Sequence, residues 1–216
     1  MKLTEKLLDL LYPPRCAFCR RLLWRDALMC PECAKSLPYT GAAARYGKIA
    51  HIAGCVSPLY YEGDVRASLL RYKFHSLTAY SKVYSKIIVK CIDECQISCD
   101  IITWVPLSAK RLRKRGYDQA RLLAEEIARE KNIPCVRLLK KTVNNPAQSG
   151  TGSPEKRKAN VAGVYAYAPD RPLDGKSVLL IDDIVTTGAT LSECARVLKA
   201  EGAGPVYAAT LARTRE

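Results

Sequence analysis

The stretch Val178-Leu-Leu-Ile-Asp182-Asp183-Ile-Val-Thr186-Thr187-Gly188-Ala189-Thr190 says most about the architecture of this chain. It opens with four apolar residues, a run typical of a strand buried on both faces of a parallel sheet. Two adjacent acids follow, and then small and hydroxyl residues. The next apolar residues recur at helical spacing, at Leu191, Cys194, Ala195 and Leu198. The order of strand, loop and helix predicts one βα unit of a parallel sheet.

Similar units recur through most of the chain. Strand-like runs occupy 56–61, 101–105, 136–139, 161–168 and 206–211. Helical patterns occupy 1–12, 65–73, 79–95 and a segment whose inner face is Ala120, Leu123, Ala124 and Ile127. A polar stretch rich in Asn, Ser, Gly and Pro covers 142–160. This alternation predicts an α/β fold with a doubly wound parallel sheet.

Four cysteines near the start form a separate pattern. Cys16-Ala-Phe-Cys19 and Cys30-Pro-Glu-Cys33 are two CxxC pairs within a short segment. Each pair places two thiolates on one tight turn, and two pairs complete a tetrahedral Zn²⁺ site. Four unrelated buried thiols would not explain the repeated spacing. Because four thiolates leave no position for water, we expect the zinc to be structural.

The other six cysteines follow apolar patterns. Cys91 and Cys95 continue the apolar stripe of the helix over 79–95, so core packing is the favoured interpretation. A second metal site of Cys91, Cys95 and Cys99 is the alternative. The N-terminal leucines are interrupted by Glu5 and Asp9, unlike a secretion signal, so we expect reduced thiols in a cytoplasmic protein.

Composition sets the class of protein and of partner. The chain has 216 residues, 48% of them hydrophobic, which is enough for one ordinary domain and a small module. We expect a zinc module at 1–40, a linker at 41–54 and the α/β domain at 55–216. No apolar run is long enough to cross a bilayer. The net charge of +14 favours partners rich in phosphate without choosing among them.

The segment from Asp182 onward has the chemistry of a sugar-phosphate site. In parallel sheets, ligands bind beyond the carboxyl ends of the strands. The two acids offer acceptor oxygens that suit a vicinal diol. Gly188 lets the backbone close around a phosphate at a helix N-terminus, and hydroxyl donors come from Thr186, Thr187 and Thr190. The alternative is a simple capping box of Thr190 and Glu193 with two ordinary loop acids.

This segment resembles the phosphoribosyl-pyrophosphate (PRPP) motif of type I phosphoribosyltransferases. The resemblance implies that Asp182 and Asp183 bind the ribose 2′ and 3′ hydroxyls. It also implies that the following loop binds the 5′-phosphate, with the residues Thr186, Thr187, Gly188, Ala189 and Thr190. Family members use Mg²⁺ with PRPP, so a Mg²⁺ cofactor is implied as well.

Three further stretches resemble the ComF family (ComFC and GntX-like proteins). They are the segment 11–19 with its first CxxC, the segment from Tyr61-Glu62-Gly63 to Tyr72-Lys73-Phe74, and Val105-Pro106-Leu107 with Arg115-Gly116-Tyr117-Asp118-Gln119-Ala120. ComF proteins join an N-terminal zinc module to a phosphoribosyltransferase domain, and some serve DNA uptake in competence. The chain departs from the family around Gln148, where a Thr-x-x-Gln-x-x-Leu pattern lacks its leucine.

A basic segment supports the same site. Cations occupy five of the six positions from 110 to 115, in a predicted turn after a sheet strand. A solvated charged face is the alternative. In the phosphoribosyltransferase fold the corresponding loop holds pyrophosphate, and Arg111 and Arg115 are the candidates because a guanidinium matches phosphate oxygens. Lys140 and Lys141 are weaker candidates.

Three hypotheses for function follow. The first is displacement of pyrophosphate from C1′ of PRPP by an unassigned acceptor, with Asp182, Asp183, Arg111 and Arg115 as catalytic residues. Neither histidine lies in a motif, so no general base is assigned. The second is a non-catalytic protein of DNA uptake that binds PRPP and single-stranded DNA, with a competence helicase-type protein as partner. The third, a purine or pyrimidine salvage enzyme, leaves the zinc module without a purpose.

Overall fold

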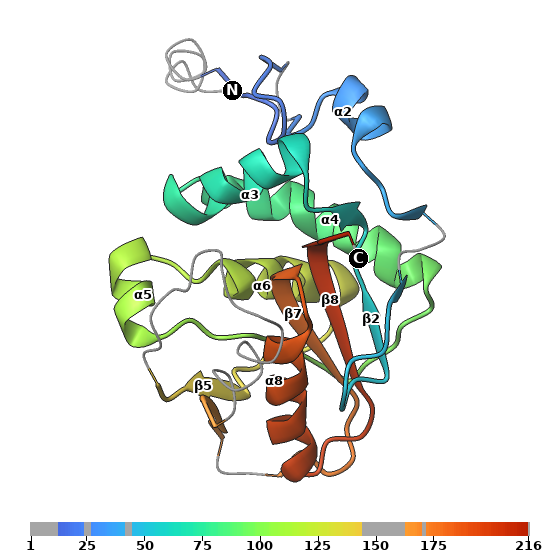
Figure 1. Ribbon diagram of the computed structural model, residues 1–216, viewed down its shortest axis with the longest axis vertical. Coiled ribbons are helices and arrows are strands. Elements are labelled where there is room, and N and C mark those ends of the chain that lie inside the picture. Colours follow the sequence, from blue (N-terminus) through green and yellow to red (C-terminus); the bar gives the residue numbers. More distant parts are fainter. Residues whose placement is uncertain (1–12, 24–26, 42–44, 144–162, 170–171, 216) are drawn as a thin grey trace.

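The computed structural model describes residues 13–23, 27–41, 45–143, 163–169 and 172–215 (Figure 1). The helix expected over 1–12 and most of the polar stretch at 142–160 lie outside the described residues. The elements are α2 (Pro31–Ser36), β1 (Arg45–Tyr46), β2 (Gly54–Val56), β3 (Leu59–Tyr60), α3 (Gly63–Phe74), η2 (Thr78–Tyr80), α4 (Ser81–Glu94), β4 (Ile101–Trp104), α5 (Ala109–Arg115), α6 (Gln119–Lys131), β5 (Leu139–Lys141), β6 (Tyr165–Tyr167), β7 (Val178–Val185), α8 (Ala189–Ala200) and β8 (Val206–Arg213).

A six-stranded sheet forms the centre of the molecule. Its order is β1-β2-β8-β7-β4, and β3 also pairs with β8. All pairs are parallel except β1 with β2. The long central pair runs in register from Val178 opposite Val206 to Val185 opposite Arg213. The predicted parallel sheet is therefore confirmed, with one antiparallel strand at its edge.

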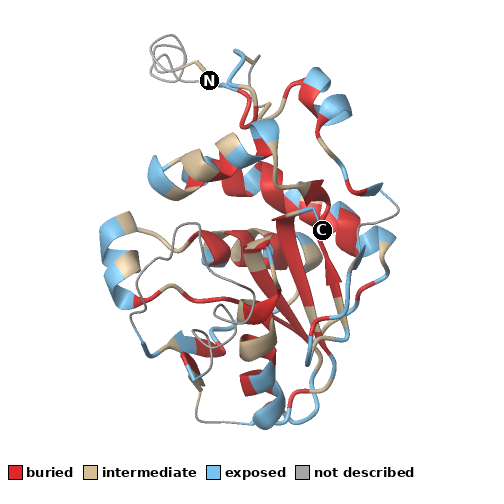
Figure 2. Ribbon diagram, viewed as in Figure 1, coloured by how far each residue is buried: buried red, intermediate tan, exposed pale blue. Residues whose placement is uncertain are grey.

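Helices cover both faces of this sheet, and the alternation of side chains along β7 shows why. Val178 and Leu180 belong to the core beneath α8, whereas Leu179 and Ile181 belong to the core shared with α4 and α6. All four side chains are essentially inaccessible to solvent, and buried residues fill the centre of Figure 2. A strand buried on both faces needs apolar residues at every position, as the sequence has here.

The short strands differ from their predicted bounds. The strand expected at 56–61 is two strands, β2 and β3, because Pro58 has no N–H to donate to the ladder. The strand expected at 136–139 shares only Leu139 with β5, which begins there and pairs antiparallel with β6 in a second, two-stranded sheet. Strand β6 contacts α8. Upstream of β5, Cys135 contributes only an isolated bridge to Ile102.

The carboxyl ends of β4 and β7 lie at the same edge of the sheet because the two strands are parallel neighbours. Helix α3 lies across the carboxyl ends of the central strands (Figure 1). Helix α5 follows β4 at this edge, and α8 follows β7. Within the described ranges, no helix is both long and apolar enough to span a bilayer.

Candidate functional site

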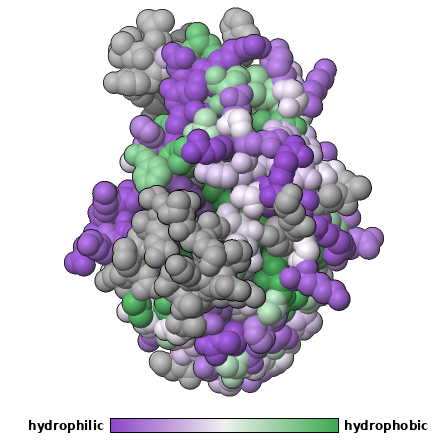
Figure 3. Space-filling view, viewed as in Figure 1, coloured by the Kyte–Doolittle hydropathy of each residue, from purple (hydrophilic) through white to green (hydrophobic). Residues whose placement is uncertain are grey.

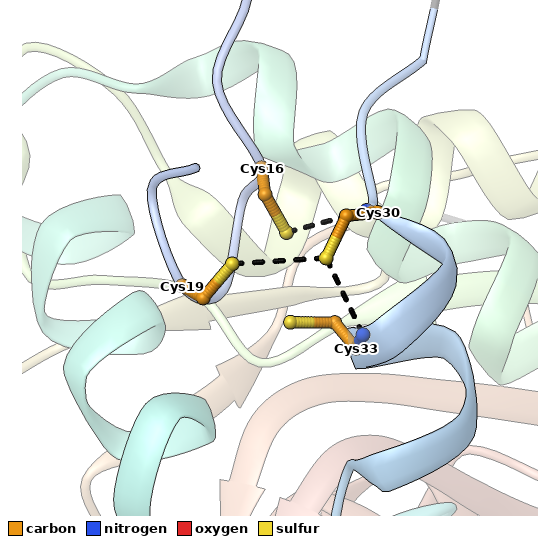
Figure 4. Close-up of side chains that lie close together, drawn as sticks. All are labelled: Cys16, Cys19, Cys30 and Cys33. Atoms are coloured by element: carbon orange, nitrogen blue, oxygen red, sulfur yellow. Dashed lines mark hydrogen bonds between the residues drawn. The ribbon is translucent and has the colours of Figure 1, made fainter. Parts of the chain in front are cut away.

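The four cysteines of the CxxC pairs converge on one point (Figure 4). Their Sγ atoms all lie within 4.8 Å of one another, and those of Cys19 and Cys30 are 3.7 Å apart. Thiolates bound tetrahedrally to zinc at about 2.3 Å would be separated by about 3.8 Å. The donor set and its spacing therefore fit a structural Zn²⁺ ion.

Backbone amides favour a thiolate at Cys16, whereas burial raises the pKa of Cys30 and Cys33. Burial raises the pKa of the Cys16 thiol, but hydrogen bonds from the backbone of Cys30, Cys19 and Phe18 outweigh it and bring the pKa to about 7. The alternative site does not form: within the described part of the chain, Cys91, Cys95 and Cys99 make no such group. Cys91 is buried in the apolar face of α4, as the core interpretation predicts.

The first zinc knuckle is anchored on α3. The Ala17 carbonyl accepts hydrogen bonds from the Ser68 hydroxyl and from Nη2 of Arg71, which lies 3.0 Å away. The same Nη2 lies 2.5 Å from the Phe18 carbonyl oxygen. The Phe18 ring packs on Tyr84 of α4, with ring centroids 5.7 Å apart. The cysteine cluster thus shares one core with the helices that cover the sheet.

Asp182 and Asp183 lie near the carboxyl end of β7, which extends to Val185 and is longer than the predicted strand. Asp183 is buried, with 4% of its surface exposed, and Asp182 is half-buried. The Asp183 N–H donates to Oδ1 of Asp182 at 2.8 Å. The two acids are thus neighbours near the end of β7, with side chains that alternate across the strand, and the side chain of Asp183 faces α3.

A lysine that sequence reasoning gave no role faces this acid pair. Nζ of Lys73, at the end of α3, lies 2.9 Å from Oδ2 of Asp183, and both side chains are largely buried. That oxygen is shielded from solvent and has no regular hydrogen bond among the described residues, so its charge depends on this ion pair. The motif that resembles ComF contains Lys73, but only the folded chain places it against Asp183.

The ionisation of Asp182 predicts a pH dependence of binding. Burial and the neighbouring Asp183 raise the pKa of Asp182 to about 8, against the pull of Lys73. A carboxylate that accepts hydrogen bonds from a diol must be ionised, so we expect the affinity for PRPP with Mg²⁺ to rise from pH 6.5 to 8.5. The increase is at most about tenfold per pH unit for one proton released. Calorimetry in two buffers of different ionisation heat counts that proton, and zero protons released at pH 7 contradicts the prediction.

The same shift predicts the direction of a stability change. The folded chain holds the Asp182 proton up to about pH 8, whereas the unfolded chain loses it near pH 4. The contribution of Asp182 to stability is therefore fully present below about pH 4 and is lost progressively as the pH rises to about 8. The charged groups that face it are Asp183, Lys73, Asp118 and Lys141. Asp182→Asn removes this pH dependence, which denaturation curves at pH 6 and pH 9 would measure.

The predicted phosphate loop leads from β7 into α8. The residue before α8 is Gly188, at φ 72°, and no side chain caps the helix. The Ala189 N–H points at Oγ1 of Thr187, 3.4 Å away. The capping-box alternative does not form, because Glu193 pairs with Arg196 and accepts from the Gly163 N–H at 2.8 Å. Thr186, Thr187 and Thr190 surround a helix N-terminus of the kind that binds anions.

Gly188→Ala is expected to lower the free energy of unfolding by about 2–5 kcal/mol. A left-handed backbone costs a non-glycine residue about 1–2 kcal/mol, and overpacking adds about 1–3 kcal/mol. The new Cβ would lie 2.8 Å from Cγ1 of Ile49. Denaturation of Gly188→Ala and of Gly175→Ala separates the two effects, because Gly175 has φ 75° but open space around it. Equal losses in the two variants would exclude the contact with Ile49.

The basic segment is a helix and not the predicted turn. Helix α5 begins after Ser108, whose Oγ accepts from the Arg111 N–H, and ends at Gly116 with φ 82°. Its residues Arg111, Lys114 and Arg115 face Lys73 across a cavity of about 470 Å³. Burial lowers the pKa of Lys141, and the positive charge of Arg111 lowers it further. The structure thus brings Arg111 and Arg115 to the cavity that Lys73 also lines, places Lys141 within electrostatic reach of Asp182, and leaves Lys140 exposed.

Asp118 is a second residue that sequence reasoning did not single out. Its Oδ1 accepts from the N–H groups of Ala120 and Arg121 and caps α6, and its Oδ2 accepts from the Leu107 N–H at 3.0 Å. Burial raises the pKa of Asp118 above its ordinary value. Asp118 therefore fixes the entry to α6 and the segment after β4 relative to each other.

Two family models match the chain. A phosphoribosyl transferase domain model matches residues 117–216, and a double zinc ribbon domain model matches residues 7–48. The first match contains the acid pair and the loop before α8. The second contains all four clustered cysteines.

Named relatives share parts of the sequence. The chain is 36% identical to competence protein ComFC of Bacillus subtilis over 115 residues, which are 53% of this chain and 45% of that protein. It is 26% identical to the DNA utilization protein YhgH of Escherichia coli over 215 residues, covering 92% of this chain and 90% of the relative. Among solved structures, adenine phosphoribosyltransferase from Leishmania tarentolae has a TM-score of 0.38 at 18% identity, covering 63% of this chain and 58% of that one.

Proposed function

We propose that the chain is a ComF-like protein that binds PRPP with Mg²⁺, because a phosphoribosyl transferase domain model and a double zinc ribbon model match it and its relatives include a ComFC protein and a YhgH protein. We further propose that it transfers the phosphoribosyl group to an acceptor and releases pyrophosphate. The Zn²⁺ site is structural and takes no part in the reaction.

The observation that carries this proposal is the acid pair of β7 beside the N-terminus of α8. Asp182 and Asp183 accept hydrogen bonds from the two ribose hydroxyls. The 5′-phosphate binds at the loop from Thr186 to Thr190, where the end of a helix favours negative charge. Diol and phosphate contacts on one βα unit fix the sugar at both ends.

The cations of α5 act on the leaving group. Arg111 and Arg115 hold the pyrophosphate as the bond from C1′ to its oxygen breaks. Positive charge develops on the ribose at that moment, and the two carboxylates favour it. Mg²⁺, when bound with PRPP, neutralises part of the pyrophosphate charge. Catalysis on this scheme depends on positioning and fixed charge, with no side chain forming a covalent intermediate.

Release of pyrophosphate is the direct test. The zinc-loaded protein is mixed with PRPP and Mg²⁺ and a panel of nucleobases, amines and aromatic acids, while PRPP affinity is measured separately by calorimetry. Pyrophosphate formation with one class of acceptor is the expected result. Failure to bind PRPP would refute the proposal, and binding without pyrophosphate release would leave only its donor-binding half.

A second candidate is a non-catalytic accessory protein that binds PRPP and single-stranded DNA. The net charge of +14 and the names of the relatives, a competence protein and a DNA utilization protein, favour it. A competence helicase-type protein remains the proposed partner. Titration with a single-stranded oligonucleotide at 50 mM and 200 mM salt tests this candidate, because phosphate contacts weaken steeply as salt rises.

A further inference from the structure

A cavity of about 470 Å³ opens between the end of α3 and helix α5. Its lining residues are Lys73, Phe74, Ser76, Arg111, Lys114 and Arg115. Lys73, which lines the cavity, is also paired with Asp183 at 2.9 Å. This lysine therefore links the cavity to the acid pair that the proposed function assigns to the sugar.

The lining of the cavity is strongly cationic. Four of its six residues are lysine or arginine, and none is a carboxylate. Cations brought together in one concave site repel one another and concentrate anions there. Arg111 and Arg115 are assigned above to pyrophosphate, whereas Lys114 has no role in donor binding. The cavity thus has positive charge beyond what the donor requires.

Phe74 adds an aromatic surface to the same cavity. It is one of only two phenylalanines in the chain, and its exposed fraction of 67% is the highest of the large apolar side chains described. The Arg115 guanidinium lies over its ring at 5.3 Å from the centroid. In Figure 3, a small hydrophobic patch near the end of α3 lies beside the hydrophilic surface of α5. A ring and a guanidinium held together form a stacking surface for a flat molecule.

We propose that this cavity is the acceptor subsite and that the acceptor is a planar aromatic acid with a nucleophilic nitrogen. This inference rests on the proposed function. The carboxylate pairs with Lys114, the ring stacks on Phe74, and the nitrogen is directed toward C1′. A neutral nucleobase would gain the stacking contact but would leave the lysine charge unmatched. The cavity therefore selects for negative charge on the acceptor.

The transfer balances with these partners alone. The nitrogen lone pair forms the new bond to C1′ while the bond from C1′ to the pyrophosphate oxygen breaks, and its electron pair leaves on pyrophosphate. A nitrogen that carries a hydrogen releases that proton to the departing pyrophosphate. A ring nitrogen without a hydrogen needs no base and becomes cationic. No oxidant, reductant or further co-reactant is required.

Equilibrium binding to the full zinc-loaded chain tests the inference without relying on turnover. Nicotinate is compared with nicotinamide, and 2-aminobenzoate with 2-aminobenzamide, each in the presence and absence of PRPP and Mg²⁺. We expect each acid to bind at least about tenfold more tightly than its amide, because a charged hydrogen bond is lost in the amide. Equal affinities within each pair, or binding of neither member, would overturn the inference.

Single substitutions identify which side chains of the cavity cause the preference for acids over amides. Lys114→Gln is expected to abolish the preference for acids, and Phe74→Ala to weaken acids and amides alike. Lys110→Gln is the matched control, since Lys110 is exposed on the same helix but does not line the cavity. A preference that survives Lys114→Gln would overturn the assignment. If the acids bind but PRPP does not, the proposed function fails and the cavity remains a site for aromatic acids.

Discussion

Replacing Asp182 and Asp183 together with asparagine is expected to lower the affinity for PRPP with Mg²⁺ at least about 100-fold. Each carboxylate accepts a charged hydrogen bond from the ribose diol, worth about 1.5–3 kcal/mol, and tenfold in affinity corresponds to about 1.4 kcal/mol. The amide side chains keep the shape of the pair but lose its charge. Calorimetric titration of the double variant measures the loss.

The fold is expected to survive the loss of both carboxylates when the charge of Lys73, the ion-pair partner of Asp183, is removed as well. Removing the Asp183 charge leaves a largely buried lysine unpaired, so a triple variant with Lys73→Gln serves as the folded reference. Asp174→Asn is the matched control, because Asp174 is exposed, lies before β7 and has φ 49°, which asparagine tolerates. Undiminished PRPP affinity in the double variant would show that the ribose binds elsewhere.

Removal of zinc is expected to unfold the first knuckle and to loosen α3 with it. Structural zinc contributes about 10–16 kcal/mol of binding free energy in zinc-finger peptides. Without it, the knuckle would be held on α3 and α4 only by the carbonyl hydrogen bonds and by the Phe18 ring. Ser68 and Arg71 lose their carbonyl partners when the loop with Ala17 and Phe18 is released. Hydrogen exchange after chelation should therefore increase in 13–23, in 27–41 and in α3, while β7 and α8 stay protected.

Cys33→Ser should reproduce the effect of the chelator. Cys135→Ser is the control, because Cys135 is a half-buried cysteine outside the cluster. Loss of PRPP affinity in the zinc-free protein is also expected, since Lys73 is carried by α3. Unchanged hydrogen exchange across 27–41 after complete zinc removal would contradict the structural role of the ion.

The unit from β7 to α8 could be predicted from the sequence because its signals are local. A strand buried on both faces is a continuous apolar run, and the acids and Gly188 follow within a few positions. The zinc cluster could be predicted equally well, because two CxxC pairs specify four ligands without knowledge of the rest of the fold. Both features depend on residues that are close together in the sequence, so a short segment is enough to predict each of them.

Features that depend on distant contacts were not predicted. Lys73 and Asp183 are 110 positions apart, and only the docking of α3 on the sheet brings them together. The cavity at Phe74 arises from the same docking. Helix α5 was mistaken for a turn because its residues 109–115 bury no side chain, so no apolar stripe marks it, although Ser108 and Gly116 are ordinary capping residues.

Helix α3 binds the zinc knuckle through Ser68 and Arg71 and reaches the acid pair through Lys73. This double attachment limits how hybrid proteins could be assembled from relatives. A zinc ribbon taken from a relative would place a loop that does not match Ser68 and Arg71 against these two side chains. Helix α3 would then shift, and Lys73 would move away from Asp183. A workable hybrid would exchange the ribbon and α3 as one block, with its junction after Phe74.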